Sequence, residues 1–140
     1  MNVLVIDAQG GGLGKQLIAE LKKALPEAQL TAVGANSAAT AAMRKAGADA
    51  AATGENAVAV ACRRADVIAG PIGIVIADSM LGEITPAMAT SVGQSAAKRV
   101  LIPVNRCETL VAGVGSGSTA ALIEDAVKKI VKIAEGNNAS

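Results

Sequence analysis

The sequence alternates between short apolar runs and longer amphipathic segments. The apolar runs are rich in Val, Ile, Leu and Ala and mostly end at Gly, Asn or Asp, which is typical of buried strands. Strands that alternate with helices predict a parallel sheet covered by helices on both faces. The predicted strands are 2–6, 30–33, a weaker strand at 49–52, 67–69, 74–77 and 100–104.

The amphipathic segments contain start and stop residues that place the predicted helices. Pro26 ends the first helix, and Pro86 begins the fourth with Thr85 as its cap. Gly47 is a typical residue for the end of the second helix. The predicted helices are one through Leu17, Ile18, Leu21 and Leu25, one from Asn36 or Ser37 to about 46, one over 55–65, one from Pro86, and a last one through Leu122, Val127, Ile130 and Ile133.

One predicted strand departs from the parallel pattern. Residues 109–112 follow the strand at 100–104 after only four residues, which is too short for a parallel crossover. We therefore expect a three-layer, Rossmann-like α/β fold with a mostly parallel sheet and an antiparallel edge strand. The 140 residues suit a single domain over 1–135, followed by a frayed tail at 136–140.

Composition restricts the chemistry and the partners of this protein. The chain has no His, Phe, Tyr or Trp, so it lacks an imidazole base and any ring that stacks on a nucleobase or a flavin. The net charge is +1 with Lys and Arg scattered, which argues against nucleic acid as a partner. The longest apolar run, 67–77, is too short to span a bilayer, so no membrane partner is expected.

The two cysteines, Cys62 and Cys107, have no metal-ligand spacing. Two free thiols in a chain without a signal peptide suit a reducing cytoplasm, which is the expected location. A nucleophilic cysteine needs an activating partner, and the chain has no His. Both cysteines are therefore interpreted as structural or incidental.

The segment DAQGGGLGKQ follows the first predicted strand and is the main candidate for binding. Its glycines allow positive φ and close approach of a ligand to the backbone. Amide groups at the start of the next helix then point to one spot, where the helix dipole favours an anion, and Lys15 adds a positive charge. The alternative is a turn that only lets the helix pack closely on the sheet. The predicted phosphate cradle consists of Gly10, Gly11, Gly12, Leu13, Gly14 and Lys15.

This loop resembles the Gly-rich loops of short-chain dehydrogenases and of ParA-like ATPases. The end of the dehydrogenase loop is matched by Gly12, Leu13 and Gly14. The ATPase loop is matched by Gly11, Gly12, Gly14 and Lys15, whereas Gly10 replaces its signature Lys. Both matches are partial, because Asp7 stands where the dehydrogenase loop has Thr and Gln16 replaces the hydroxyl residue that holds Mg²⁺ in the ATPases. The dinucleotide fingerprint G-x-G-x-x-G is also met only in part. The resemblance implies a nucleotide or dinucleotide without choosing between them.

Polar residues after other strands extend the candidate site. Asn36 and Ser37 follow the second strand, where NAD sites carry an acid that binds ribose, and either residue can bond a ribose or cap the helix. Asp7 and Asp78 each follow an apolar strand, and the segment IVIAD resembles a Walker B strand. Two such acids can share a Mg²⁺ ion, or each can cap a turn.

The loop before Pro86 is crowded with polar residues, including Asp78, Ser79 and Glu83. Glu83 can accept hydrogen bonds from ribose, act as a general acid or base, or simply add negative charge at a helix start. If the protein is an enzyme, Glu83 or Asp78 is the candidate base and Lys15 the electrostatic stabiliser.

The chain as a whole resembles a family of small bacterial proteins classed as a domain of unknown function. The motifs that carry this resemblance run from about residue 1 to 113. It implies a compact Rossmann-like protein with no assigned activity, and it supports treating the Gly-rich loop and 78–86 as one site. The motifs are NVLVIDAQGGGLGK, AVGANSAAT, GADAAATGENAV, GPIGIVIADSMLGEITPAMA and KRVLIPVN.

The expected function is binding of a nucleotide or another phosphorylated metabolite through the Gly-rich loop. Two alternatives stay open: a Mg²⁺-dependent phosphohydrolase or kinase-like enzyme, and a non-enzymatic assembly or regulatory subunit. A homodimer is expected, because closed two-fold dimers are the commonest oligomers. The residues expected to contact the sugar or a metal are Asp7, Asn36, Ser37, Asp78, Ser79 and Glu83.

Overall fold

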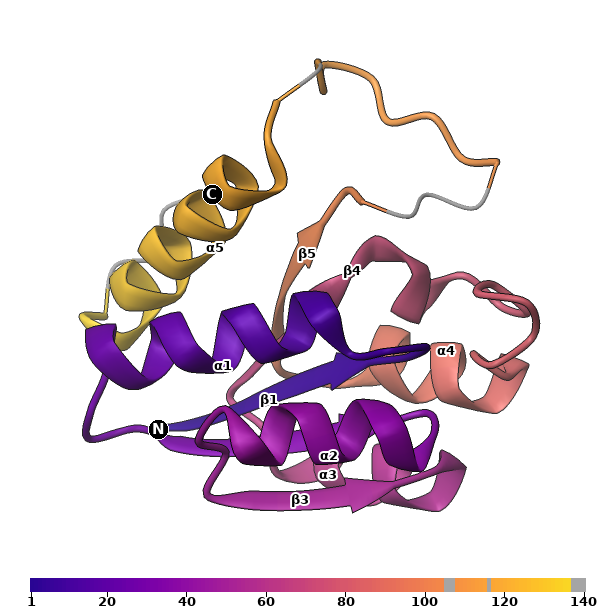
Figure 1. Cartoon of the computed structure of the whole chain (residues 1–140), viewed down its shortest axis with the longest axis horizontal. Coiled ribbons are helices and arrows are strands. Elements are labelled where there is room, and N and C mark those ends of the chain that lie inside the picture. The colour runs from indigo at the N-terminus through magenta and orange to yellow at the C-terminus, as the bar shows by residue number, and fades with distance from the viewer. Residues whose placement is uncertain (105–107, 116, 137–140) are drawn as a thin grey trace.

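The computed structural model describes residues 1–104, 108–115 and 117–136 (Figure 1). Strands and helices alternate along the chain as the sequence predicts. The strands are β1 (Asn2–Asp7), β2 (Gln29–Gly34), β3 (Ala50–Thr53), β4 (Val67–Pro71) and β5 (Lys98–Ile102). The helices are α1 (Gly12–Ala24), α2 (Ser37–Lys45), α3 (Glu55–Arg64), a short 3₁₀ helix η1 (Ile72–Val75), α4 (Pro86–Gln94) and α5 (Thr119–Ala134).

The five strands form one parallel sheet in the order β3-β2-β1-β4-β5. β1 is central and pairs with β2 on one side and β4 on the other, so that Val3 lies opposite both Leu30 and Val67. The strand order reverses between β1 and β4, and in folds of this kind ligands bind at such a reversal, beyond the carboxyl ends of the strands. The loops after β1 and β4 are therefore the ones that the fold brings to a binding position.

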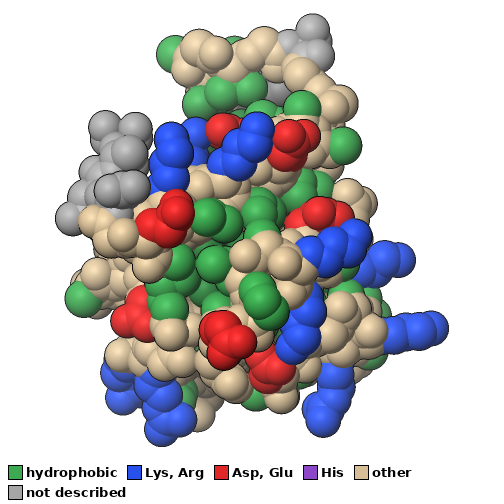
Figure 2. Space-filling model, turned by 90° about the vertical axis from the view of Figure 1, so that its left-hand side faces the viewer, with side chains coloured by type: hydrophobic (Ala, Val, Ile, Leu, Met, Phe, Trp, Pro, Cys, Tyr) green, Lys and Arg blue, Asp and Glu red, His purple; other side chains and the backbone are tan. Residues whose placement is uncertain are grey.

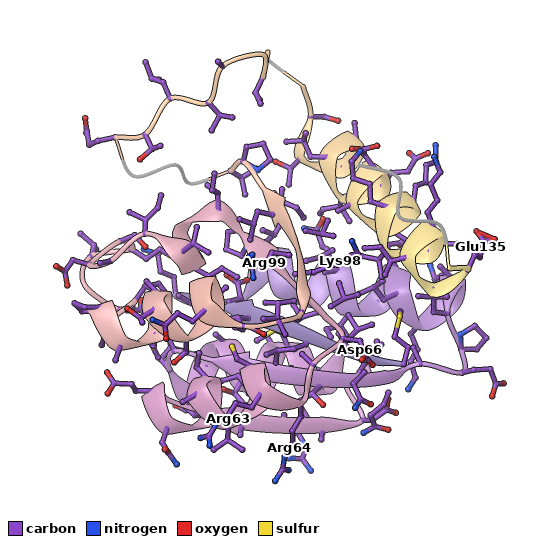
Figure 3. All side chains as sticks on the ribbon, turned by 180° about the vertical axis from the view of Figure 1, so that it is seen from behind. Arg63, Arg64, Asp66, Lys98, Arg99 and Glu135 are labelled. Atoms are coloured by element: carbon purple, nitrogen blue, oxygen red, sulfur yellow. The ribbon has the colours of Figure 1, made fainter. Side chains whose placement is uncertain are left out.

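Helices cover both faces of the sheet, and side chains of β1 alternate between the two resulting cores. Val3 and Val5 pack with α1, α2 and α5, whereas Leu4 and Ile6 pack with α3 and α4. The view from behind shows α3 and α4 in front of the sheet (Figure 3). The three-layer α/β arrangement expected from the sequence is confirmed.

Hydrogen-bonding side chains begin three of the helices. The side chain of Thr85 accepts a hydrogen bond from the backbone N–H of Met88, which confirms Thr85 as the cap of α4. The cap of α2 is Asn36, whose side chain accepts a hydrogen bond from Ala39, and Ser37 is the exposed first residue of the helix. At the start of α5 the same role falls to Ser118.

The predicted antiparallel edge strand is wrong. Residues 109–112 form loop and turn between β5 and α5, and all the strand pairs in the described part of the chain are parallel. The apolar character of this segment misled the prediction, because a short apolar run does not by itself specify a strand partner. Leu110 is 92% exposed.

The predicted strand at 74–77 is also wrong. Pro71 ends β4, because it has no N–H to continue the ladder. The chain then turns through η1, and Ile74 reaches the core from this short helix. The single domain over 1–135 stays a prediction, and the predicted frayed tail lies outside the described residues except for Gly136.

The amino edge of the sheet carries charges of both signs. Figure 2 shows Lys and Arg interspersed with Asp and Glu around hydrophobic side chains on this face. The absence of a nucleic acid partner stays a prediction. No helix in the described ranges is long and apolar enough to cross a membrane.

Candidate functional site

The loops after β1 and β4 meet at the carboxyl edge of the sheet, on the right-hand side of Figure 1. The backbone N–H of Gln9, in the first loop, donates a hydrogen bond of 3.1 Å to Oε1 of Glu83, in the second. The strand reversal predicts this meeting point, and the hydrogen bond fixes which residues make it. The two segments that the sequence singles out therefore lie together.

Asp7 is the last residue of β1 and is only 5% exposed. Its Oδ1 accepts a hydrogen bond from the N–H of Ala8 at 2.8 Å, and its Oδ2 accepts one from the N–H of Gly14 at 2.7 Å. Burial raises the pKa of Asp7, the two amides oppose that rise, and the negative charge of Glu83 adds to it. Asp7 thus holds the first turn of α1, and both of its oxygens are engaged within the protein.

Two glycines of the Gly-rich loop are required for close packing. Gly11 has a φ of 73°, and a Cβ there would lie 2.8 Å from the backbone Cα of Ala39 in α2. A Cβ on Gly14 would lie 2.6 Å from Sδ of Met43 and 2.9 Å from Cβ of Asp7. At these two positions, the glycines are explained by the close packing of the loop against its neighbours.

The other two glycines, Gly10 and Gly12, face open space, since an added Cβ would have no atom within 4 Å. Their N–H groups and that of Leu13 have no hydrogen-bond partner among the residues that the structure describes. Lys15, in the same turn, is exposed and makes no ion pair with any described residue. The start of α1 therefore presents three free donors and one free cation to solvent.

Glu83 is held by two other loops at once. Its Oε1 accepts hydrogen bonds from the N–H of Gln9 and, at 2.6 Å, from Nδ2 of Asn36. Its Oε2 has no partner within the described part of the chain, and the residue is half-buried. One carboxylate oxygen is thus fixed by the protein while the other is available.

Asn36 links the ends of β1 and β2 to this carboxylate. Its Nδ2 also donates to the carbonyl oxygen of Gln9 at 2.9 Å, and its Oδ1 accepts from the N–H of Ala39 at 2.9 Å. All polar groups of the side chain are therefore used within the protein. Asn36 positions Glu83, which supplies a carboxylate beside the end of β2, where the sequence itself has no acid.

The remaining predicted residues differ in their placement. Ser79 is buried, and its hydroxyl donates to the carbonyl oxygen of Gly73 at 2.6 Å. Asp78 is exposed and has a φ of 64°, in a loop where Met80 and Leu81 also have positive φ. Ser79 thus has a structural bond, whereas Asp78 lies at the surface.

A metal site has little support from the placement of acidic residues. No group of three or more Cys, Asp or Glu residues suited to a metal occurs in the described ranges.

Burial raises the pKa of the Cys62 thiol to about 11, which makes it a poor nucleophile at neutral pH. Cys107 lies outside the described residues.

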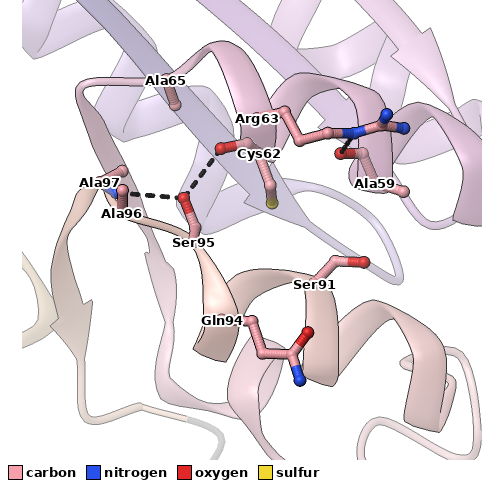
Figure 4. A pocket seen from close by; sticks show the side chains of 9 residues that line it. All are labelled: Ala59, Cys62, Arg63, Ala65, Ser91, Gln94, Ser95, Ala96 and Ala97. Atoms are coloured by element: carbon pink, nitrogen blue, oxygen red, sulfur yellow. Dashed lines mark hydrogen bonds between the residues drawn. The ribbon is translucent and has the colours of Figure 1, made fainter.

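A separate hollow of about 410 Å³ lies between α3 and α4, at the carboxyl ends of these helices and thus at the opposite edge of the sheet (Figure 4). Ser95 is a polar side chain of its lining that bonds to other residues of the hollow. The hydroxyl of Ser95 donates to the carbonyl oxygen of Cys62 at 2.8 Å and accepts from the N–H of Ala97 at 3.1 Å. This hollow is therefore distinct from the candidate site.

A family profile described as "Domain of unknown function (DUF3842)" matches residues 2–135. The chain belongs to this family. Membership confirms the resemblance that the sequence motifs carry. Among curated proteins, no relative matches the sequence.

A solved structure with a similar course of the chain is a dodecameric FMN-dependent UbiX-like decarboxylase from Escherichia coli O157:H7. It is 14% identical, with a TM-score of 0.44, and the alignment covers 98% of this chain and 95% of that one.

Sequence reasoning missed Gln9 and the positioning role of Asn36. Gln9 has a φ of 52°, which turns its backbone so that both its N–H and its carbonyl oxygen bond to the neighbouring loops. No local pattern marks such a residue, because its partners follow other strands. The triple glycine that comes next marks a turn, but it does not show that the backbone of Gln9 bonds to other loops.

Proposed function

We propose that this protein binds a phosphorylated ligand that also carries hydroxyl groups, with a nucleotide as the leading class. The observation that carries the proposal is the pairing of free N–H groups at the start of α1 with an available carboxylate oxygen on Glu83. Amides at a helix start favour a phosphate, and a fixed carboxylate favours a sugar hydroxyl.

The phosphate is assigned to the N–H groups of Gly10, Gly12 and Leu13. Lys15 adds a positive charge in the same turn, and the dipole of α1 adds to it. The nearby carboxylates of Asp7 and Glu83 oppose a phosphate electrostatically. We therefore expect Lys15 to contribute strongly, because it offsets these negative charges.

The hydroxyl groups are assigned to Oε2 of Glu83. Its other oxygen is held by Gln9 and Asn36, so the carboxylate needs no rearrangement to accept a hydroxyl. A preorganised acceptor of this kind adds selectivity for a sugar phosphate over inorganic phosphate. Since the chain has no aromatic residue, a nucleobase would be held by aliphatic and backbone contacts.

No reaction is assigned. Glu83 is the best-placed candidate base, and the Mg²⁺-dependent alternative lacks a cluster of acids in the described ranges. A non-enzymatic binding or regulatory role uses the same geometry.

The first test uses the absence of Trp and Tyr. The desalted protein is nearly transparent in the near ultraviolet, so a retained nucleotide shows directly as an absorption band, and mass spectrometry after denaturation identifies it. A blank spectrum excludes a tightly retained nucleotide. In that case titration calorimetry measures the binding of added ligands. The titrants are adenosine monophosphate, ribose 5-phosphate, ribose and inorganic phosphate.

Two variants separate the assigned contacts. Lys15→Gln is expected to weaken binding of the phosphorylated titrants by roughly tenfold, whereas Lys23→Gln, exposed on the same helix, leaves it unchanged. Glu83→Gln is expected to weaken ribose 5-phosphate more than inorganic phosphate. If none of the four titrants binds and no chromophore is retained, the proposal fails.

A further inference from the structure

The outer edge of β5 borders a groove. A hollow of about 440 Å³ is lined by every residue of 98–103 and by one stripe of α5. β5 is an outer strand of the sheet, so a hollow that touches every one of its residues extends along its outer edge. The stripe of α5 consists of Leu122, Asp125, Ala126, Lys129 and Ile133.

The hollow at the opposite edge of the sheet, near β3, has a different set of contacts. The hollow near β3 touches Ala50 and Ala52 but neither of the residues that follow them, and it also touches α3. Contact with alternate residues indicates a hollow over a face of the sheet. Of these two hollows, the one beside β5 touches every residue of an outer strand, whereas the one near β3 reaches over the sheet to Asn2, Val3 and Leu4 of the central strand.

β5 is the last strand of the sheet, so its outer backbone groups are unpaired in the described part of the chain. Such an edge accepts a further strand. Most side chains of β5 point to the two faces of the sheet and leave the edge open to a further strand. Val100 and Ile102 are buried on the α5 side, and Leu101 is half-buried on the other.

The two cations at the start of β5 behave differently. Arg99 is turned toward α4, where its Nη1 donates to the carbonyl oxygens of Ser95 at 2.8 Å and of Ala97 at 3.3 Å. Lys98 is exposed and points to the α5 side, as Figure 3 shows. Of these two cations, Lys98 therefore projects its charge on the side of the groove where Asp125 and Lys129 of α5 also lie.

We propose that the occupant of this groove is β5 of a second copy of the chain, paired antiparallel about a two-fold axis at Val100. In this register Val100 lies opposite itself, Arg99 opposite Leu101 and Lys98 opposite Ile102. No like charges face each other directly in this register. Like-charged cross-strand pairs would destabilise the pairing. The parallel sheet of each copy then continues into the other through one antiparallel step.

Charge complementarity supports a second copy as the occupant. α5 returns along the sheet in the direction opposite to β5, so Asp125, near its start, lies toward the Ile102 end of the groove. The two-fold axis brings the partner's Lys98 to this end. Asp125 pairs with Lys129 at 2.6 Å and its side chain is 61% exposed, so it remains accessible to a second cation.

The first experiment is a charge exchange followed by sedimentation equilibrium of the full chain. We expect a dimer of the natural sequence, a roughly tenfold or larger increase in its dissociation constant for Lys98→Glu and for Asp125→Lys, and recovery in the double variant. Both side chains are exposed in one copy, so folding should be retained, and circular dichroism checks it. Exchange of Lys23 for Glu on α1 is the matched control.

The second experiment tests the register by cross-linking in a Cys107→Ser background. Directly opposed residues lie within disulfide range, so Val100→Cys is expected to form a covalent dimer under mild oxidation. Leu101→Cys is not expected to form a covalent dimer, because in this register residue 101 lies opposite residue 99 and not opposite itself. A monomer at about 100 µM, a dimer insensitive to both charge changes, or cross-linking at 101 instead of 100 would overturn the proposal. None of these outcomes depends on ligand binding.

Discussion

Asp7 is a carboxylate that the fold keeps almost entirely away from water while it binds two backbone amides. Its pKa is raised, mainly by burial, so the folded protein holds a proton at pH values where the unfolded chain has lost it. The contribution of Asp7 to the free energy of unfolding therefore falls as pH rises from 3.8 to the raised value. Above that value the contribution is constant.

This sign gives a prediction for pH dependence. The difference in free energy of unfolding between the natural protein and Asp7→Asn should decrease as pH rises through the same window. Asp49, whose pKa Lys22 lowers, has the opposite dependence, but it is present in both proteins and cancels. Chemical denaturation followed by far-ultraviolet circular dichroism measures the difference, and an increase with pH would contradict the assignment.

The glycines of the binding loop should differ sharply in their tolerance to substitution. We expect Gly14→Ala to cost about 1–3 kcal/mol, because the new Cβ would overlap Met43 and Asp7. Gly11→Ala adds a left-handed φ to its overlap with Ala39 and should cost at least as much. Gly10→Ala is the matched control with a small expected effect. Denaturation midpoints test the order.

At the scale of elements, helix ends carry much of the information that the sequence contains. Pro26, Thr85 and Pro86 act locally, so their effects on helix limits were predictable. The failed strands at 74–77 and 109–112 are apolar too, but apolar character does not specify a strand partner, and neither segment pairs with a strand of the sheet. That information lies in the packing of distant elements.

The start of α2 allows a direct comparison of neighbouring residues. Asn36→Ala should lower the free energy of unfolding by about 0.5–2 kcal/mol, because it removes the cap of the helix. It also removes a hydrogen bond to Glu83. Ser37→Ala, at the next position, should have little effect, since Ser37 is exposed. Thermal unfolding of both variants provides the measurement, and equal losses would refute the assignment of the cap.

The candidate site shows the same limit of sequence reasoning. Its position was predictable, because parallel strands place their following loops at one edge. The contact between Glu83 and Asn36 joins residues 47 positions apart, and it follows from the exact turn of the loop after β4. A carboxylate delivered from such a distance leaves no local signature after β2.

For the whole molecule, pairing through β5 makes stability depend on protein concentration. If two copies share the sheet, the melting temperature should rise as the concentration is increased. Lys98→Glu should reduce this dependence, because it weakens the interface and leaves the fold of each copy unchanged. A series of thermal melts over a wide concentration range tests this, with a concentration-independent melting temperature as the contrary result.

The position of β1 in the sheet has a consequence for synthesis of the chain. The strand at the centre of the sheet is translated before the other four strands of the sheet, and one of its two neighbours, β4, begins only at Val67. β2 and β3 follow in order and can join on one side as they emerge. The other side of β1 stays unpaired until β4 has been translated, so the nascent chain exposes the edge of a hydrophobic strand during that interval.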